Sequence, residues 1–305
     1  MLAVVGTIPD SDFPIVAGEA SLKDEHLVIQ GKHLSVNRGT PALLAAAVQT
    51  AQALGRSAPF AYLVGDIGFG DGSRNLYEYL VRHLPESSCR TIAFHYLQPD
   101  VDWHNLVLFA IEEMTERPVL IADAGFMYAA KMSGQSAAYD LFTPDAGELA
   151  FLADEEAPHP FYTRGFILHE QENTPQLIAR AYAHQNAARH LLVKGQPDYV
   201  ANEKGVLATI DSPANEAMES IGGTGDTITG IVSALIDGHW GVAEAAIIST
   251  HINRFSGHYA TATPASSVME LIRHIPRAIR EVLSSQHSER FLCRVESEKQ
   301  DSSCH

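Results

Sequence analysis

The fold of this chain is limited most by the alternation of short β-type runs with longer helical patterns. Such an alternation is typical of a mostly parallel sheet that is covered by helices. Because Pro276 lies inside the last helical pattern, we expect a kink or break there. The β-type runs span residues 2–8, 61–65, 118–122, 191–194 and 206–210, and the helical patterns span residues 40–54, 76–84, 106–115, 174–189, 224–237, 242–255 and 268–283.

We predict one α/β domain over residues 1–283, because neither an internal repeat nor a linker divides that stretch. From residue 284 onward the composition becomes polar and charged, so we predict that the tail 284–305 is disordered. Residues 155–169 contain two prolines beside aromatic residues. We interpret that segment as an insertion or a lid-like loop.

The charge balance excludes several classes of partner. The chain has 21 Lys and Arg against 37 Asp and Glu, a formal net charge of −16. Such a surface repels phosphate backbones and anionic lipids, so we expect neither a nucleic-acid nor a membrane partner. No apolar run approaches the roughly 20 residues of a spanning helix, and the first residues lack the basic flank of a signal peptide. Three cysteines without CxxC spacing argue against a disulfide framework and a thiolate zinc site, and we predict a cytoplasmic location.

The strongest local signal for chemistry is the glycine-rich run 222–226, which leads directly into a helical pattern. Glycines at that place leave backbone N–H groups free at a helix N-terminus, where they and the helix dipole favour an anion. Asp226 then lies in the first turn. It is either an acid that stabilises the dipole by about 0.3–1 kcal/mol, or a general base beside a phosphate. The run is neither a P-loop nor a dinucleotide fingerprint, because the GxxxxGK[ST] and GxGxxG spacings are absent.

The residues Gly223-Thr224-Gly225-Asp226, followed by Gly230, resemble the anion-hole signature of the ribokinase superfamily. The closest resemblance is to its carbohydrate-kinase-like branch, which contains the ATP- or ADP-dependent NAD(P)H-hydrate dehydratases. Five further stretches agree with that branch in order and spacing, and together they extend from about residue 39 to residue 260. They are an early Gly-Ala-rich helix at 39–47, a Gly-rich turn at 65–70, a strand end with Asp123 at 119–124, a Thr-Pro-x-x-Gly-Glu element at 143–148, and a Lys-Gly strand end at 192–195.

This resemblance implies a three-layer α/β/α ribokinase-like fold and the use of ATP or ADP with Mg²⁺. It assigns catalysis to Gly223, Thr224, Gly225 and Asp226. The implied nucleotide contacts are Lys194, Gly195, Gln196, Pro197, Asp198 and Gly225, and the implied substrate-side residues are Gly70, Asp123, Asp145 and Asp226. Glu148 either helps to hold Mg²⁺ through water or is merely an acid at a helix start. Lys194 suits a phosphate as a point charge, although a solvated strand end is the alternative.

Some residues depart from the family pattern. Asp145 replaces a histidine, Gly125 replaces the second acid of an Asp-Ala-Asp strand end, and the segment 215–221 is one residue longer. The negative charge at Asp145 would oppose a phosphate-bearing dinucleotide. The resemblance therefore favours a hydrate dehydratase, while Asp145 favours either a kinase for a small alcohol or an altered acceptor. A catalytically inactive nucleotide sensor is the alternative from another class. We expect a small-molecule substrate, and the family resemblance implies that the chain can assemble into a homo-oligomer.

The fifteen histidines show no HExxH motif and no pairing with cysteine at ligand spacing, which argues against a metal site built on them. The segment 95–104, which begins and ends with histidine, is dense in polar and aromatic side chains. It either lines the acceptor pocket or forms a surface loop with satisfied histidines, and we favour the surface loop. Cys89 has no evident activating partner, and the absence of GxSxG argues against nucleophilic acyl chemistry.

Overall fold

A computed structural model of the chain describes residues 1–160, 163 and 173–284. The predicted insertion at 155–169 lies largely outside the described residues, and so does the predicted disordered tail apart from its first residue. Both therefore stay predictions. Among the described residues, no helix combines the length and the apolar character that a bilayer-spanning segment needs.

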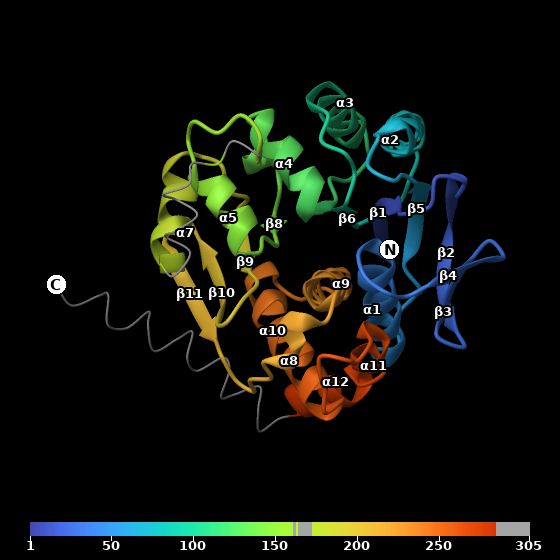
Figure 1. The fold of residues 1–305 in the computed structure, drawn as a ribbon. Helices are drawn as coiled ribbons and strands as arrows, with labels where there is room; N and C mark the ends of the chain where they lie inside the picture. The colour runs from blue at the N-terminus through green and yellow to red at the C-terminus, as the bar shows by residue number, and fades with distance from the viewer. Residues whose placement is uncertain (161–162, 164–172, 285–305) are drawn as a thin grey trace.

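One mixed sheet runs through the molecule (Figure 1). In the described part of the chain it has eleven strands, in the order β11-β10-β9-β8-β7-β6-β1-β5-β2-β3-β4. The six central strands, from β9 to β5, are parallel, as the alternating sequence pattern predicted. They are β1 (Leu2–Ile8), β5 (Phe60–Gly65), β6 (Thr91–His95), β7 (Val119–Ala122), β8 (Leu141–Phe142) and β9 (His190–Val193).

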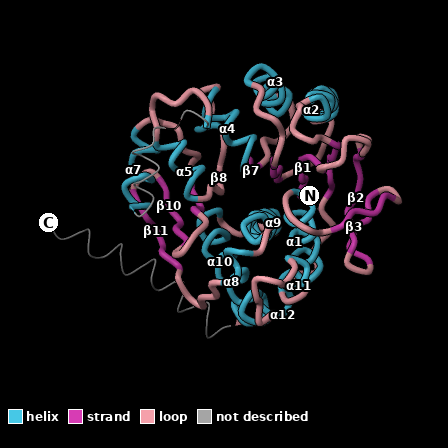
Figure 2. The backbone as a smooth tube through the Cα atoms, in the orientation of Figure 1, coloured by secondary structure: helices cyan, strands magenta, loops and turns pink. Residues whose placement is uncertain are grey.

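Antiparallel strands extend both edges of this parallel core (Figure 2). Two of them follow β9, and three lie beyond β5. The three beyond β5 were not expected from the sequence. They are joined by two-residue turns in which both residues have positive φ, Asp24-Glu25 and Gln30-Gly31, which is the geometry of a type I′ hairpin turn. The edge strands are β10 (Asp198–Asn202), β11 (Gly205–Ile210), β2 (Val16–Lys23), β3 (His26–Ile29) and β4 (Lys32–Ser35).

Helices cover both faces of the sheet, which gives three layers (Figure 1). Alternate residues of β1 belong to different cores: Leu2 and Val4 pack in one hydrophobic cluster, and Ala3 and Val5 in the other. This alternation is what a strand buried on both faces requires. One layer contains α1 (Thr40–Ala53), α9 (Thr224–Asp237), α10 (Val242–Tyr259), α11 (Val268–Ile272) and α12 (Ile275–Leu283); the other contains α2 (Asp71–His83), α3 (Val101–Glu112), α4 (Ala124–Met132), α5 (Ala146–Ala153) and α7 (Thr174–Ala183).

The helix α9 packs very closely against α1. A side chain at Gly230 would place its Cβ only 2.1 Å from the carbonyl oxygen of Leu43, so the two backbones meet at this glycine. The sequence predicted α9 with the bounds that the structure has. The close packing fixes the first turn of α9, and with it Asp226, beside the start of α1.

Two further expectations have clear outcomes. The break near Pro276 is confirmed, because α11 ends at Ile272 and α12 begins at Ile275 with the proline in its first turn. The surface-loop interpretation of residues 95–104 is wrong. His95 ends β6 and His104 lies in α3, and both side chains are completely buried. The polar residues of this segment are used at a strand end and as the helix N-cap, Asp100.

Candidate active site

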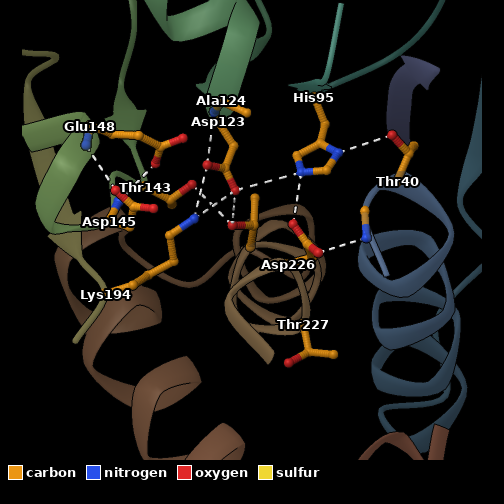
Figure 3. A network of polar contacts seen from close by, with 12 residues as sticks. Thr40, His95, Asp123, Ala124, Thr143, Asp145, Glu148, Lys194, Asp226 and Thr227 are labelled. Atoms are coloured by element: carbon orange, nitrogen blue, oxygen red, sulfur yellow. Dashed lines mark hydrogen bonds and ion pairs between the residues drawn. The ribbon is translucent and has the colours of Figure 1, made fainter. Parts of the chain in front are cut away.

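Charged side chains gather at the carboxyl ends of the parallel strands (Figure 3). His95 is the last residue of β6, Asp123 follows β7, and Lys194 follows β9. Asp226 faces them from the first turn of α9. The carboxyl edge of such a sheet is where α/β proteins bind ligands. The fold thus brings three of the predicted site residues, Asp123, Lys194 and Asp226, into one place.

The carboxylate of Asp226 is held at both oxygens. The backbone N–H of Gly39 donates to Oδ2 at 2.7 Å, and His95 Nε2 lies 3.0 Å from Oδ1. Burial alone would raise the pKa of Asp226, but the hydrogen bond and charge of His95, the charge of Lys194 and the amide of Gly39 together lower it to about 2. Asp226 is therefore ionised at neutral pH and fixed in direction.

His95 is itself held from behind by Thr40, the first residue of α1. Thr40 Oγ1 lies 2.9 Å from Nδ1, and both side chains are buried. An ionised carboxylate only accepts hydrogen bonds, so Nε2 carries the hydrogen that points to Asp226. When the ring is neutral, Nδ1 accepts from the Thr40 hydroxyl, and when the ring is charged, Nδ1 donates to that hydroxyl. The hydrogen-bond network assigns this tautomer.

Asp123 and Lys194 form a second, adjacent pair. Lys194 Nζ donates to both oxygens of Asp123, at 2.9 and 3.0 Å. The hydroxyl of Thr229 on α9 donates to Oδ2 at 2.7 Å, and the N–H of Ala124 donates to Oδ1 at 2.9 Å. Burial alone would lower the pKa of Lys194, but Asp123, Glu148 and Asp226 hold it above its usual value. The ammonium therefore stays charged although the Lys194 side chain is largely buried.

The backbone bends sharply after two of these residues. Tyr96, after His95, has φ 52°, and Ala124, after Asp123, has φ 49°. Left-handed conformations of non-glycine residues cost on the order of 1–3 kcal/mol and cluster at functional sites. The same bend explains why Gly125 replaces an acid of the family pattern: a Cβ there would lie 2.2 Å from the carbonyl oxygen of Leu97.

The glycine-rich turn before α9 has the geometry that its sequence predicted. Gly223 is the N-cap residue with φ 99°, so the first-turn amides point out of the helix end. A Cβ at Gly225 would lie 3.4 Å from Cδ and 3.8 Å from Nζ of Lys194. The missing side chain therefore leaves room between the helix end and the lysine. The Thr224 hydroxyl points away from this room and donates to the carbonyls of Met218 and Ile221.

The predicted nucleotide turn 194–198 is held by an arginine that the sequence analysis did not single out. Arg254 of α10 pairs with Asp198 at 2.7 Å and donates to the carbonyl of Gly195 at 3.0 Å. Asp198 also accepts from the N–H of Gly195 at 2.8 Å. The Asp198 carboxylate is thus buried in the support of the turn. A charged residue among the buried positions of α10 was the sequence signal that could have revealed Arg254.

Asp145 and Glu148 form a reciprocal capping box at the start of α5. Asp145 Oδ1 accepts from the N–H of Glu148, and Glu148 Oε2 accepts from the N–H of Asp145, both at 2.8 Å. The Tyr128 hydroxyl donates to Glu148 Oε1 at 3.3 Å. Burial, together with the charges of Asp123 and Asp145, raises the pKa of Glu148 to about 8 despite the opposing effect of Lys194. Because its Oδ1 accepts from the N–H of Glu148, the Asp145 carboxylate points to the first turn of α5.

Gly70 lies at a separate place on this edge of the sheet. It lines a hollow of about 200 Å³ together with Arg74 and Gln98. The turn that contains Gly70 is fixed by Asp66, which accepts from the amides of Gly68, Gly70 and Ser73. Phe69 in this turn is 81% exposed.

A larger hollow of about 400 Å³ lies near the start of β7, lined by Arg117 and Arg189 among others. Both arginines pair with the single carboxylate of Asp140. This hollow lies at the opposite end of the strands from Asp226, and we assign it no part in the site.

Three possible metal-ligand atoms, one each from His95, Asp123 and Asp226, lie within 4.8 Å of one another. Each of these side chains is already bonded within the protein, and Lys194 occupies both oxygens of Asp123. We therefore assign no metal to this trio. Glu148 also lies close enough to raise the pKa of Lys194. Among the described residues, its side chain bonds only to the backbone of Asp145 and to Tyr128.

Comparison with known proteins gives this geometry a family. Residues 98–277, more than half of the chain, match the family model of NAD(P)H-hydrate dehydratase in the carbohydrate kinase group. The chain belongs to the NAD(P)H-hydrate dehydratase family. A relative from Methanocaldococcus jannaschii, the uncharacterized protein MJ1337, is 42% identical over 220 residues, which are 72% of this chain and 90% of that protein. The bifunctional NAD(P)H-hydrate repair enzyme of Pyrobaculum aerophilum is 29% identical over 142 residues, which are 46% of this chain and 25% of that enzyme.

Solved structures agree with the NAD(P)H-hydrate dehydratase family in fold. A ribokinase-like superfamily protein from Enterococcus faecalis has a TM-score of 0.56 at 14% identity, covering 92% of this chain and 86% of that chain. The ADP/ATP-dependent NAD(P)H-hydrate dehydratase of Bacillus subtilis, co-crystallized with ATP and Mg²⁺, has a TM-score of 0.53 at 15% identity, covering 92% and 89%. The predicted ribokinase-like α/β/α fold is confirmed.

The match to the NAD(P)H-hydrate dehydratase family begins at residue 98. Gly39, Thr40 and His95 therefore precede the matched segment, although two of them contact Asp226 directly and the third supports His95. None of the sequence stretches that carried the resemblance contains residue 95, so the family pattern singled out Asp226 and Lys194 but not His95. The roles that the sequence assigned to individual site residues stay predictions, which the experiments below test.

Proposed function

We propose that the chain is a nucleotide-dependent dehydratase that restores hydrated NADH or NADPH, with ATP or ADP as the phosphoryl donor. Membership of the NAD(P)H-hydrate dehydratase family supports this function. The proposal includes a small-molecule substrate, which the net negative charge favours over a nucleic acid or a membrane. It also includes a cytoplasmic location, which the cysteine content supports, and a homo-oligomeric state, which the family resemblance supports.

One observation carries the proposal. The open first turn of α9, the Lys194 ammonium and the ionised Asp226 carboxylate meet at the carboxyl edge of the sheet. Amide hydrogens and an ammonium stabilise phosphate oxygens, and a neighbouring carboxylate accepts the proton of a hydroxyl. These are the groups that phosphoryl transfer to an alcohol requires.

In this proposal Asp226 orients the hydroxyl of the hydrated nicotinamide ring and takes its proton. A carboxylate with a pKa of about 2 is a weak base, which suffices because a loose phosphoryl-transfer transition state leaves the proton on the nucleophile until late. The amides of Thr224 and Gly225, with Lys194, stabilise the charge on the transferring group. Elimination of inorganic phosphate and one ring proton from the resulting phosphate ester then restores the dihydronicotinamide.

The residues present fit a nucleotide with a divalent cation. The space that a Cβ of Gly225 would fill lies between the helix end and Lys194, which suits one oxygen of a phosphate group. Mg²⁺ prefers oxygen ligands, keeps several waters and takes few carboxylates, so Glu148 is the residue that we propose to hold it through water. The raised pKa of Glu148 would fall when the cation's charge is beside it. When bound, the nucleotide supplies the phosphoryl group and Mg²⁺ neutralises its charge.

The position of Asp145 weakens the objection to a dehydratase that its charge raised. Its carboxylate accepts from the N–H of Glu148 within the capping box. It is therefore directed along its own helix, and its charge is partly balanced by the helix N-terminus. A histidine at this position is not needed to satisfy the start of α5.

The test is recovery of reduced-nicotinamide absorbance by the purified protein from hydrated NADH or NADPH, with ATP or ADP and Mg²⁺. We expect recovery only when a nucleotide is present. Phosphate transfer to sugar or vitamin-precursor alcohols without this recovery would replace the dehydratase by a kinase. Nucleotide binding without turnover on any acceptor would leave a sensor.

A further inference from the structure

We propose that His95 is the positioning residue of Asp226, an imidazole that is clamped by Thr40 and fixes the direction of the carboxylate toward the incoming hydroxyl. The use of that carboxylate on a hydroxyl rests on the function proposed above. The pairing of His95 with Asp226 does not, and the experiment below separates the two.

The first argument is that each oxygen of Asp226 has one fixed donor. Oδ2 accepts from the amide of Gly39, and Oδ1 accepts from His95. Two donors on different oxygens prevent the carboxylate from rotating about its terminal bond. Because the Gly39 donor is part of the backbone, His95 is the side chain that completes this restraint, and each oxygen keeps a lone pair for a substrate.

The second argument is that His95 cannot move. Its side chain is completely buried, and Thr40 behind it is only 1% exposed. The ring of Tyr96 meets the imidazole edge-on, with the ring centres 4.2 Å apart. Thr40 is fixed in turn by Gly6, where even a Cβ would lie 2.5 Å from the threonine hydroxyl oxygen. Such closely packed supports hold a functional group in place.

The third argument is that both ring nitrogens of His95 are used. Nε2 serves Asp226 and Nδ1 serves Thr40. A histidine that acted on substrate directly would need a free nitrogen facing the site. His95 therefore acts through Asp226, which makes it a positioning residue.

The electrostatic surroundings agree with this role. In the described part of the chain, the titratable and charged groups beside Asp226 are His95 and Tyr96 from β6 and the residue after it, Asp123 after β7, and Lys194 after β9. Asp123 is neutralised by Lys194. His95 is the group bonded directly to the Asp226 side chain, and its contribution heads those that lower the pKa of Asp226.

The test compares two amides at position 95 in the full-length protein. In His95→Gln, the amide nitrogen takes the place of Nε2 and can still donate to Asp226. In His95→Asn, the shorter amide takes the place of Nδ1 and reaches only Thr40. The pKa of Asp226 is followed by ¹³C NMR of labelled aspartate carboxyls, with Asp226→Asn identifying the signal.

We expect His95→Asn to raise the pKa of Asp226 by about 1–2, since a lost hydrogen bond no longer opposes burial. His95→Gln should keep that pKa below its ordinary value. In turnover, His95→Asn should lower kcat by about 10–100-fold, as misplaced catalytic groups do, with nucleotide Kd unchanged and partial recovery in His95→Gln. An unshifted pKa in His95→Asn, or a kcat equal to that of the wild type, would overturn the assignment.

Thr40→Val is the second variant, because it removes one hydroxyl and keeps the side-chain volume. It should shift the pKa of Asp226 in the same direction as His95→Asn but by less, and an unchanged value would count against the clamp. If the wild-type protein restores no NADH or NADPH from the hydrates, the proposed function fails. The NMR comparison alone then decides the role of His95.

Discussion

Arg254 and Asp198 form a buried ion pair, with 2.7 Å between Nε and Oδ2, that ties α10 to the turn after β9. The same guanidinium donates to the carbonyl of Gly195. The turn that we assign to the nucleotide is thus supported by a residue of α10, and Arg254 and Asp198 are 56 positions apart in the sequence. Its shape depends on a planar fork of donors, which lysine does not offer.

Arg254→Lys keeps the positive charge and loses this fork. We expect the Kd for ATP, measured by titration calorimetry, to rise by about tenfold or more, since charge-assisted contacts of this kind contribute about 1.5–3 kcal/mol. Arg273→Lys, at an exposed arginine in the same C-terminal helical region, is the control and should leave Kd unchanged. An unaltered Kd in Arg254→Lys would place the nucleotide elsewhere.

Asp226→Asn should bind nucleotide as the wild type does and lose turnover. Removal of a general base costs about 10²–10⁴-fold in rate. The matched control is Asp145→Asn, because asparagine is as good an N-cap as aspartate and the Asp145 carboxylate serves only its own helix in our account. Steady-state kinetics with calorimetric Kd values checks both. Equal rates in Asp226→Asn and the wild type would remove Asp226 from the mechanism.

Gly225→Ala tests the space beside Lys194. The added Cβ meets Lys194 at 3.4 Å or more, which is ordinary contact, so we expect stability to be unchanged or raised by about 0.5–1 kcal/mol. Nucleotide affinity should nevertheless fall, because the methyl group fills the position of a phosphate oxygen. Retained affinity would contradict the proposed phosphate position.

Gly230→Ala, in the same helix, should behave in the opposite way. Its Cβ would collide with the Leu43 carbonyl at 2.1 Å, and overpacking of this kind typically costs about 1–3 kcal/mol. Denaturant unfolding of the two variants side by side separates a loss of fold from a loss of site. Equal stability of both variants would contradict the close packing of α9 on α1.

His104 predicts a pH dependence of stability. The ring is completely buried against the Tyr139 hydroxyl at 2.8 Å, and burial lowers the pKa of His104 from 6.5 to about 4. Between about pH 6.5 and pH 4, His104 is therefore protonated in the unfolded chain but not in the folded protein. The free energy of unfolding should fall between about pH 6.5 and pH 4, by about 3 kcal/mol from this group.

The control for this pH effect is His104→Gln, which keeps a polar side chain near Tyr139 and does not titrate. Urea unfolding at several pH values should give a flatter profile for His104→Gln than for the wild type. Parallel profiles would show that His104 already titrates normally in the folded protein.

Sequence reasoning reached α9 and Asp226 because their signals are local: a glycine-rich turn, an acid in the first turn and an apolar period after it. It missed His95 because the contact with Asp226 joins residues 131 positions apart, and because no strand was predicted over residues 91–95. The β2–β4 hairpins were missed since one of their turns, Asp24-Glu25, lacks the glycine that usually marks this geometry. Arg254 was not singled out because its partner Asp198 is distant in the sequence, and a single arginine in a helical pattern is usually exposed.

The charge at Asp145 shows a different limit. A carboxylate in place of the family's histidine suggested an altered acceptor, since sequence gives the charge of a side chain but not its direction. In the capping box with Glu148, the Asp145 carboxylate accepts from a backbone N–H in the first turn of α5. Conversely, Gly125 follows from a backbone approach, the Leu97 carbonyl, that only the folded chain reveals.

The central claim is that Asp226 activates the hydrate's own hydroxyl for phosphoryl transfer. The most direct measurement uses NADH hydrate labelled with ¹⁸O in that hydroxyl, incubated with the protein, ATP and Mg²⁺, with ³¹P NMR or mass spectrometry of the phosphate formed. We predict one ¹⁸O in the inorganic phosphate for each NADH restored, and neither product from Asp226→Asn. Restored NADH with unlabelled phosphate would mean that the hydroxyl leaves as water and would contradict the account.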